Sequence, residues 1–311
     1  MTDTIRVRTP ATTANLGPGF DFLGMALKIY NEVEMSRTEG EGYQLSVEGL
    51  PDSDHVPRDE HNLVFRAARK VFEMAGTPPG ALNMKIRVNT PLARGLGSSA
   101  SAIVGGMTAA NELLGKPFDD QKLVYEMVAM ERHPDNVVSA YYGGLTASLV
   151  LDNRIMHRKY LPAANVACVL LIPGYELSTS RARQAIPKNV PFRDAAFNLA
   201  RIPFLIDKLT TGDLSGMGAI MDDRLHQPYR KPLIRDYDVL ADEAESAGAA
   251  AVCLSGAGPT MLALCDVKNA DNVAAAMRRV LDSIGIPCRV VVTSPDTEGT
   301  IVTRIANTET A

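Results

Sequence analysis

The segment 91–101, which reads PLARGLGSSAS, most constrains what this chain can fold into, because it stands directly before the apolar stretch 102–114. Its glycines let backbone N–H groups converge, and two adjacent serines supply hydroxyls where a helix is expected to begin. A helix N-terminus leaves four N–H groups unpaired and carries partial positive charge. These features predict an anion-binding loop, and phosphate is the anion most often bound in this way. The first hypothesis is therefore a loop that holds a nucleotide phosphate.

Other loop motifs fit less well. Residues 95–100 match the dinucleotide pattern GxGxxA, but residues 91–94 separate them from the preceding strand, and the next element is predicted to be another helix. The chain contains neither a Walker sequence GxxxxGK[ST] nor a hydrolase elbow GxSxG. A small-residue helix packed on a sheet would explain residues 100–110, but it would not explain two serines beside two glycines.

Composition places the chain among soluble globular proteins, with 46% hydrophobic and 22% charged residues over a length suited to two domains. The net charge of -4 offers no broad basic surface, so we expect no nucleic-acid partner.

The cysteines lack metal or CxxC spacing and are predicted to be buried thiols. The N-terminus lacks the apolar core of a secretory signal. Residues 255–259 interrupt the uncharged stretch 247–265, which predicts strand–turn–strand and no membrane span. We expect a cytoplasmic protein.

The pattern of elements predicts an α+β protein with mainly antiparallel sheets, because strands and helices do not alternate regularly. A composition shift near residues 160–165 indicates a boundary, with domains at 1–160 and 161–311. In the first domain we expect strands at 5–9, 28–36, 43–47 and 84–89, helices at 62–75, 98–114 and 119–131, and a hairpin at 143–160. In the second we expect strands at 166–172, 250–254, 260–264, 289–293 and 300–304, with helices around 194–210, 214–223, 233–247 and 270–283.

The full loop string resembles the phosphate loop of the GHMP kinases, the superfamily of galactokinase, homoserine kinase, mevalonate kinase and phosphomevalonate kinase. Further segments support the resemblance: ATTANLGPGFD at 11–21, HPDN at 133–136 followed by YGGL at 142–145, and SGAGPT at 255–260. Together they are similar to the homoserine kinase family over about residues 7–300.

This resemblance implies an N-terminal ATP-binding domain like the second domain of ribosomal protein S5 and a ferredoxin-like C-terminal domain, with the site between them. It implies transfer of the γ-phosphoryl group of ATP to the side-chain hydroxyl of L-homoserine in threonine biosynthesis, with ATP and Mg²⁺ as cofactors. The oligomeric state stays open, a homodimer included.

The resemblance also implies which residues contact ATP. They are Pro91, Leu92, Ala93, Arg94, Gly95, Leu96, Gly97, Ser98, Ser99, Ala100, Ser101 and Asn62. Asn62 is equally explained as the cap of its own helix. A glycine turn is expected to support the loop and help close the site, although alone it would be an ordinary hairpin turn. Its residues are Ser255, Gly256, Ala257 and Gly258.

The implied substrate ligands are Asn15, Asp21, His133, Asn136, Thr179, Arg183 and Arg230. The Asp21 carboxylate would pair with the ammonium group of the amino acid. A guanidinium fork suits a carboxylate, so the arginines with Thr179 would hold the other end. The family pattern alone favours Arg183 over Arg181, because either would otherwise be an ordinary solvated residue near a helix start.

For the metal, oxygen ligands are expected. Ser99 and Glu131 are the predicted pair, and Glu126 on the same expected helix is the alternative. Related kinases use an aspartate near residue 135 as a base, whereas the resemblance favours positioning of the hydroxyl by His133 and Asn136. Other functions remain open: a mevalonate-type kinase, which needs no ammonium acceptor at Asp21, an inactive nucleotide-binding regulator, and an NAD-dependent dehydrogenase.

Overall fold

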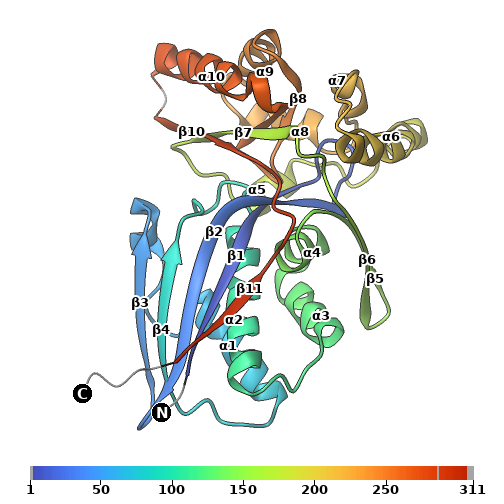
Figure 1. Ribbon diagram of the computed structural model, residues 1–311. Coiled ribbons are helices and arrows are strands. Elements are labelled where there is room, and N and C mark those ends of the chain that lie inside the picture. The colour runs from blue at the N-terminus through green and yellow to red at the C-terminus, as the bar shows by residue number, and fades with distance from the viewer. Residues whose placement is uncertain (1–2, 286, 307–311) are drawn as a thin grey trace.

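The computed structural model describes residues 3–285 and 287–306, which form two sheets with helices packed on them (Figure 1). The first sheet has seven strands in its described part, in the order β11-β1-β2-β4-β3, with β5 beside β2 and β6 beside β5. Its strands are β1 (Thr4–Ala14), β2 (Leu23–Thr38), β3 (Tyr43–Gly49), β4 (Ala81–Val88), β5 (Leu145–Leu151), β6 (Arg154–Tyr160) and β11 (Ile301–Ile305). Among the described strands, β3 and β4 form the parallel pair, and the other pairs are antiparallel.

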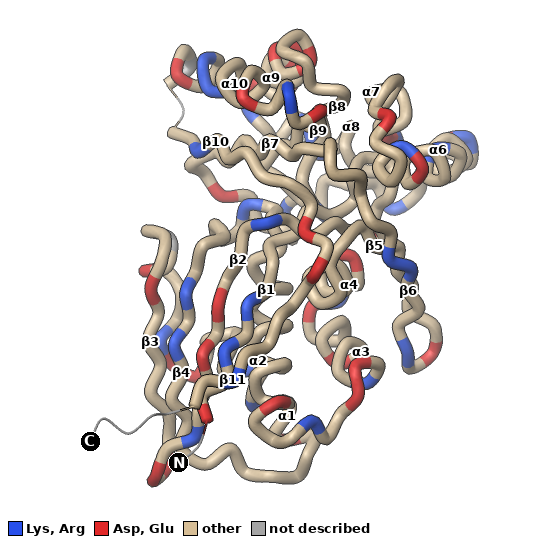
Figure 2. Tube along the Cα trace, in the orientation of Figure 1, with Lys and Arg blue, Asp and Glu red and all other residues tan. Residues whose placement is uncertain are grey.

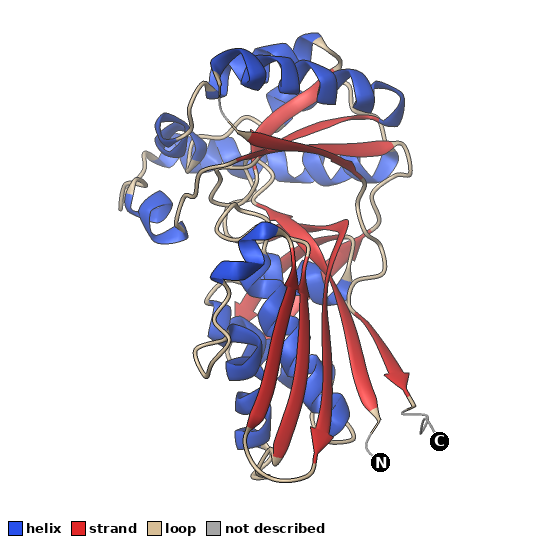
Figure 3. Cartoon of the chain, turned by 90° about the vertical axis from the view of Figure 1, so that its left-hand side faces the viewer, coloured by secondary structure: helices blue, strands red, loops and turns tan. Residues whose placement is uncertain are grey.

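One face of this sheet is buried and the other meets solvent, which follows from the alternation along its strands. In β4, Met84 and Ile86 are buried while Lys85 and Arg87 are exposed. Charged residues of both signs stand along these strands (Figure 2), and Arg87 forms an ion pair with Glu48. Helices back the opposite face (Figure 3). They are α1 (Leu63–Met74), α2 (Ser98–Leu113), α3 (Asp120–Glu131) and α4 (Pro134–Tyr142).

The second sheet has the strand order β10-β7-β9-β8, antiparallel throughout, which is the ferredoxin-like arrangement expected. Its strands are β7 (Val166–Pro173), β8 (Ala249–Leu254), β9 (Met261–Asp266) and β10 (Cys288–Thr293). Its helices are α5 (Thr179–Gln184), α6 (Phe192–Thr211), α7 (Met217–Ile220), α8 (Gln227–Arg230), α9 (Tyr237–Ser246) and α10 (Ala270–Ile284). Every residue of β7 is buried, because α9 and α10 cover one face of the sheet. The other face packs on α6 and on residues of the first domain, such as Leu16.

The fold-class prediction is confirmed, with some local corrections. The final strand β11 pairs with β1, so the chain returns to the first sheet, whereas the sequence division put residues 301–305 in the second domain. Helix α4 was not expected, because HPDN is also a turn sequence; Pro134 stands at its start, where a missing N–H costs nothing. The expected helix 214–223 is reduced to the single turn α7.

Within the described ranges, none of the helices combines the length and apolarity that crossing a bilayer requires. This agrees with the strand–turn–strand prediction for residues 247–265, which form β8, the turn and β9.

Candidate functional site

Residues 91–97 form a loop that leads into α2. Close packing around this loop leaves no room for a side chain at its glycines. Gly95 has φ 73°, and a Cβ there would lie 2.2 Å from the carbonyl oxygen of Ser255. The Ser255 hydroxyl donates to the Gly95 carbonyl at 2.6 Å, and the Gly256 N–H donates to Ala14 at 3.0 Å. The 255–258 turn therefore lies directly on the loop, where the sequence expected it.

The N-terminus of α2 is open to a ligand. Gly97 occupies the cap position in left-handed geometry, and among the described residues no side chain accepts a hydrogen bond from the first turn. Backbone N–H groups of a helix start that lack such a cap point outward and carry partial positive charge. This geometry suits an anion above Ser98 and Ser99.

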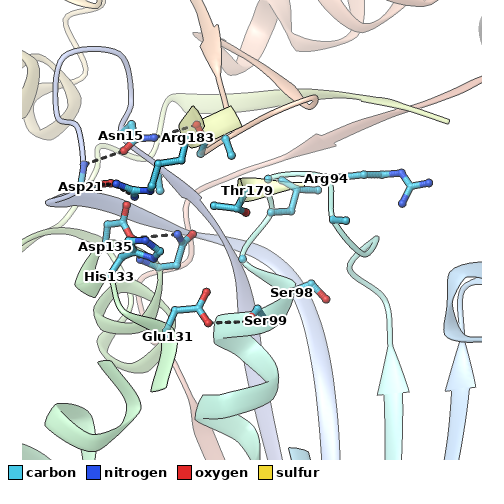
Figure 4. Close-up of a pocket in the computed structure, with 18 of the residues that line it drawn as sticks. Asn15, Asp21, Arg94, Ser98, Ser99, Glu131, His133, Asp135, Thr179 and Arg183 are labelled. Atoms are coloured by element: carbon cyan, nitrogen blue, oxygen red, sulfur yellow. Dashed lines mark hydrogen bonds and ion pairs between the residues drawn. The ribbon is translucent and has the colours of Figure 1, made fainter. Parts of the chain in front are cut away.

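Two cavities meet at this helix start. The first has a volume of about 130 Å³ and is lined by many charged and polar residues, so we call it the polar cavity (Figure 4). Its lining includes all seven predicted substrate ligands and part of the loop: Asn15, Asp21, Ala93, Arg94, Gly95, Leu96, Gly97, Ser98, Ser99, Glu131, His133, Asn136, Thr179, Arg183, Arg230, Gly256 and Ala257. The second is mainly apolar and of about 350 Å³, and it shares Ala93, Ser98 and Ser99 with the first.

Charged groups of opposite sign face each other in the polar cavity. The Asp21 carboxylate accepts two hydrogen bonds from the Arg183 guanidinium, at 2.8 and 2.9 Å (Figure 4). Asn15 accepts from the Asp21 backbone N–H and donates to the Gly256 carbonyl at 2.9 Å. Arg230 reaches the same cavity but is only 2% exposed. Its burial, with the nearby Arg183 charge, lowers the pKa of Arg230 to about 10.

Ser99, in the first turn of α2, and Glu131, at the end of α3, face one another. The Ser99 hydroxyl donates to the Glu131 carboxylate at 2.6 Å, and burial raises the pKa of Glu131. In the described residues no lysine or arginine forms an ion pair with Glu131. Glu126, by contrast, pairs with Lys122 at 2.6 Å. A hydroxyl and a carboxylate without a counter-charge fit a hard cation that takes its other ligands from phosphate and water.

A metal ion at this position would need ligands from phosphate and water in addition to the protein oxygens. Within the described part of the chain no group of three or more His, Cys, Asp or Glu residues is arranged to hold a metal ion. Mg²⁺ is commonly bound through one or two protein oxygens together with substrate phosphates, so the residues present fit it.

Asp135 lines the polar cavity, and the pKa of its carboxyl is strongly raised. It is 3% exposed, and burial is the main reason that the pKa of its carboxyl rises to about 7, with the charges of Asp21 and Glu131 adding to the effect. The Asp135 carboxylate accepts from the Asn136 backbone at 2.8 Å and from the Asn136 side chain at 3.1 Å. Thr12 donates to the Asn136 amide oxygen at 2.7 Å. Both ends of the Asn136 amide are thus held.

This raised pKa predicts a pH-dependent stability. Folding favours the protonated Asp135 carboxyl, so the free energy of unfolding should fall as pH rises from about 4 to about 7. Replacing Asp135 with Asn keeps the shape and removes the charge. We expect the variant to gain stability over the wild type between pH 4 and pH 8, on the order of 4 kcal/mol. Urea unfolding at several pH values measures it, and Asp242→Asn, at an exposed position, is the control. Parallel pH curves for the wild type and Asp135→Asn would contradict the burial argument.

Several predicted residues have supporting contacts or lie outside the polar cavity. Arg94 is among the residues that line the cavity, but its side chain points away from the other site residues (Figure 4). It donates to the carbonyls of Pro173 and Gly174, which ties the loop to the end of β7. Ser101 is buried and accepts from Asn31 at 2.7 Å, although it lines the apolar cavity. Neither cavity is lined by Pro91, Ala100, Ser255 or Gly258 in the described residues. Leu92 lines only the apolar cavity.

Asn62 caps its helix, which is one of the two explanations for it, and its predicted contact with ATP stays a prediction. Its side-chain oxygen accepts from the N–H groups of Val64 and Phe65, so it caps α1, and it also lines the apolar cavity. Part of that wall was missed from the sequence. The missed residues include His55, Val56, Pro57 and Val88, which come from separate segments and carry no motif.

Comparison with known proteins gives a consistent result. Residues 62–144 match the family of the GHMP kinases N terminal domain, and residues 205–283 match GHMP kinases C terminal. A homoserine kinase of Microchaete diplosiphon is 42% identical over 301 residues, covering 96% of this chain and 97% of that protein. The crystal structure of homoserine kinase from Cytophaga hutchinsonii aligns with a TM-score of 0.87 at 30% identity, covering 97% and 98% of the two chains. The L. major mevalonate kinase in complex with R-mevalonate aligns at 0.72 with 16% identity, covering 93% and 95%, which is a likeness of fold alone.

Proposed function

The chain belongs to the homoserine kinases of the GHMP kinase superfamily, and we propose that its polar cavity binds L-homoserine for transfer of the γ-phosphoryl group of ATP to the side-chain hydroxyl. The product is O-phospho-L-homoserine, which leads to threonine. One observation carries the proposal: a cavity whose lining includes Asp21, Arg183 and Arg230 opens onto an uncapped helix start. That cavity is complementary to a zwitterion beside a phosphate.

Each end of the amino acid has a partner of opposite charge. Asp21 binds the ammonium group, and Arg183 and Arg230 with Thr179 bind the carboxylate. In the free site Asp21 and Arg183 satisfy each other at 2.8 Å, so a zwitterion replaces one ion pair with two of the same kind. A ligand that lacks either charge leaves a polar group of the site unpaired, which supports discrimination of roughly 10⁴-fold.

The nucleotide spans the two cavities. Its base lies in the apolar cavity beside Asn62, and its phosphates lie over Ser98 and Ser99, where the loop and helix N–H groups supply hydrogen bonds. Ser99 and Glu131 hold Mg²⁺ with ATP. When bound, this ion offsets negative charge on the transferring phosphoryl oxygens.

Catalysis is then mainly a matter of alignment, as is usual for phosphoryl transfer. Asn136 and His133 orient the reacting hydroxyl. The amide of Asn136 is fixed by Thr12 on one side and by Asp135 on the other, so Asn136 presents a rigid contact. We assign Asp135 to this support and not to base catalysis. We also propose that the enzyme acts in the cytoplasm.

The test is turnover by the pure protein. With ATP and Mg²⁺, L-homoserine should release ADP in a coupled assay, and ³¹P NMR should show a phosphate monoester of homoserine. Mevalonate is the comparison substrate, because it lacks an ammonium group. Phosphorylation of mevalonate but not of homoserine would overturn the substrate assignment. Absence of ADP release with either substrate would favour a nucleotide-binding regulator.

A further inference from the structure

Arg230 is held in an unusual way for a residue that must meet a ligand. It ends α8, a helix of four residues, and is buried among groups that fix its guanidinium. Its Nη1 donates to the Gly256 carbonyl at 3.0 Å, and its Nε donates to the Ala182 carbonyl at 3.4 Å. The same Nη1 lies 3.3 Å from Nδ1 of His226. The last contact is favourable only if Nδ1 carries no proton.

The surroundings of His226 decide where its proton lies. Its ring is completely buried, and Nε2 lies 2.8 Å from the Gly17 carbonyl oxygen and 3.3 Å from the Asp223 carboxylate. Both neighbours can only accept, so Nε2 carries the hydrogen and Nδ1 keeps its lone pair. Burial is the main reason that the pKa of His226 falls to about 4, and the charge of Arg230 lowers it further. The ring is therefore neutral near pH 7.

Asp223 and Phe20 hold this imidazole in place. The Asp223 carboxylate accepts from the N–H groups of His226 and Gln227 and from the Asn198 side chain at 2.7 Å, so it does not depend on the imidazole for its partners. Phe20 stacks on the His226 ring with centroids 5.1 Å apart. The Arg230 guanidinium lies 5.4 Å from the centroid of the Phe20 ring. Ring position and ring tautomer are thus both determined.

We propose that His226, as its Nε2–H tautomer, is a positioning residue that accepts from Arg230 and aims that guanidinium at the substrate carboxylate. The inference rests on the proposed function, since it assumes that Arg230 binds the carboxylate. His226 itself does not line the cavity in the described structure, so it acts through Arg230 and not on the substrate. A buried histidine that served packing alone would not need an acceptor aligned with one N–H of a ligand-binding arginine.

Two isosteric variants separate the ring nitrogens. In His226→Gln the amide reaches the Nε2 position, so the donor to Gly17 is kept and the acceptor for Arg230 is lost. In His226→Asn the amide oxygen can stand near Nδ1, so the acceptor is kept. We expect the Gln variant to raise KM for homoserine about 10-fold, because a hydrogen bond to a charged group is lost. The kcat of the Gln variant and its KM for ATP should stay within about twofold of the wild-type values. In His226→Asn, most of the increase in KM for homoserine should be absent.

A substrate without the carboxylate provides the second readout. For L-homoserine amide, kcat/KM should be nearly the same in the wild type and in His226→Gln, because there is no carboxylate for Arg230 to meet. The positioning role would be overturned if His226→Gln lowered kcat/KM equally for homoserine and for its amide. It would also be overturned if the Gln and Asn variants had the same KM for homoserine. An unchanged KM for homoserine in a folded Gln variant would overturn it as well.

A measurement on the wild type keeps the proposal testable if the variants do not fold. In ¹⁵N-labelled protein at pH 7, the assigned His226 ring should show a proton on Nε2 and an unprotonated Nδ1. A proton on Nδ1 would overturn the inference. The proposed function fails separately, by absence of homoserine-dependent ADP release in the wild type, which the NMR experiment does not touch.

Discussion

Replacing Glu131 with Gln is expected to lower kcat roughly 10²- to 10³-fold, the usual cost of removing one group that stabilises transition-state charge. The half-buried carboxylate accepts from the Ser99 hydroxyl at 2.6 Å beside the open helix start. Glutamine keeps the size and can still accept from Ser99, but it offers a cation no negative charge. Steady-state kinetics across a Mg²⁺ titration measures both kcat and the Mg²⁺ requirement, which should rise in the variant.

Glu126 supplies a matched control on the same helix. It pairs with Lys122 and lies outside both cavities in the described structure, so Glu126→Gln should leave kcat and the Mg²⁺ requirement nearly unchanged. Ser99→Ala should resemble Glu131→Gln, and the double variant should lose less than the product of the single losses, because the two residues act on one ion. A strong effect at Glu126 with none at Glu131 would show that the metal pair has been assigned wrongly.

Replacing Arg183 with Met should raise KM for homoserine roughly 10²-fold, because a two-point contact to the substrate carboxylate disappears. The change also leaves Asp21 without the partner that holds it in the free site at 2.8 Å. Methionine keeps much of the aliphatic volume, so the packing of α5 should survive. Initial rates over a range of homoserine at saturating ATP give KM and kcat separately, and circular dichroism checks the fold.

Arg181, two residues earlier on α5, is the natural comparison. It is exposed, and it does not line the cavity in the described part of the chain. Arg181→Met should therefore leave KM for homoserine within about twofold of the wild type, since an exposed surface change has little effect. Similar KM values for the two variants, whether both raised or both normal, would remove Arg183 from the carboxylate site.

The sequence predicted those parts of the site that lie in continuous motifs. Gly95 has a positive φ, which is a local requirement for glycine, and the tertiary contact with the Ser255 carbonyl leaves no room for a side chain there. Elements with clear periodicity, such as α1 and β4, were found close to their observed bounds. The strand at 300–304 was also predicted, but its pairing with β1 was not, because strand pairing over nearly three hundred residues leaves no local trace.

What the sequence by itself determined is the chemistry available: glycines and serines at a helix start, a carboxylate at residue 21, and arginines far along the chain. Only the tertiary structure decided how these groups are used. It directs the Arg94 side chain away from the other site residues, pairs Asp21 with Arg183, and buries Asp135, which raises the pKa of its carboxyl to about 7. Orientation and burial depend on packing between segments distant in sequence, and electrostatic energies depend steeply on both. A linear motif specifies residue types and spacing, but it does not specify the surroundings that set their charge and direction.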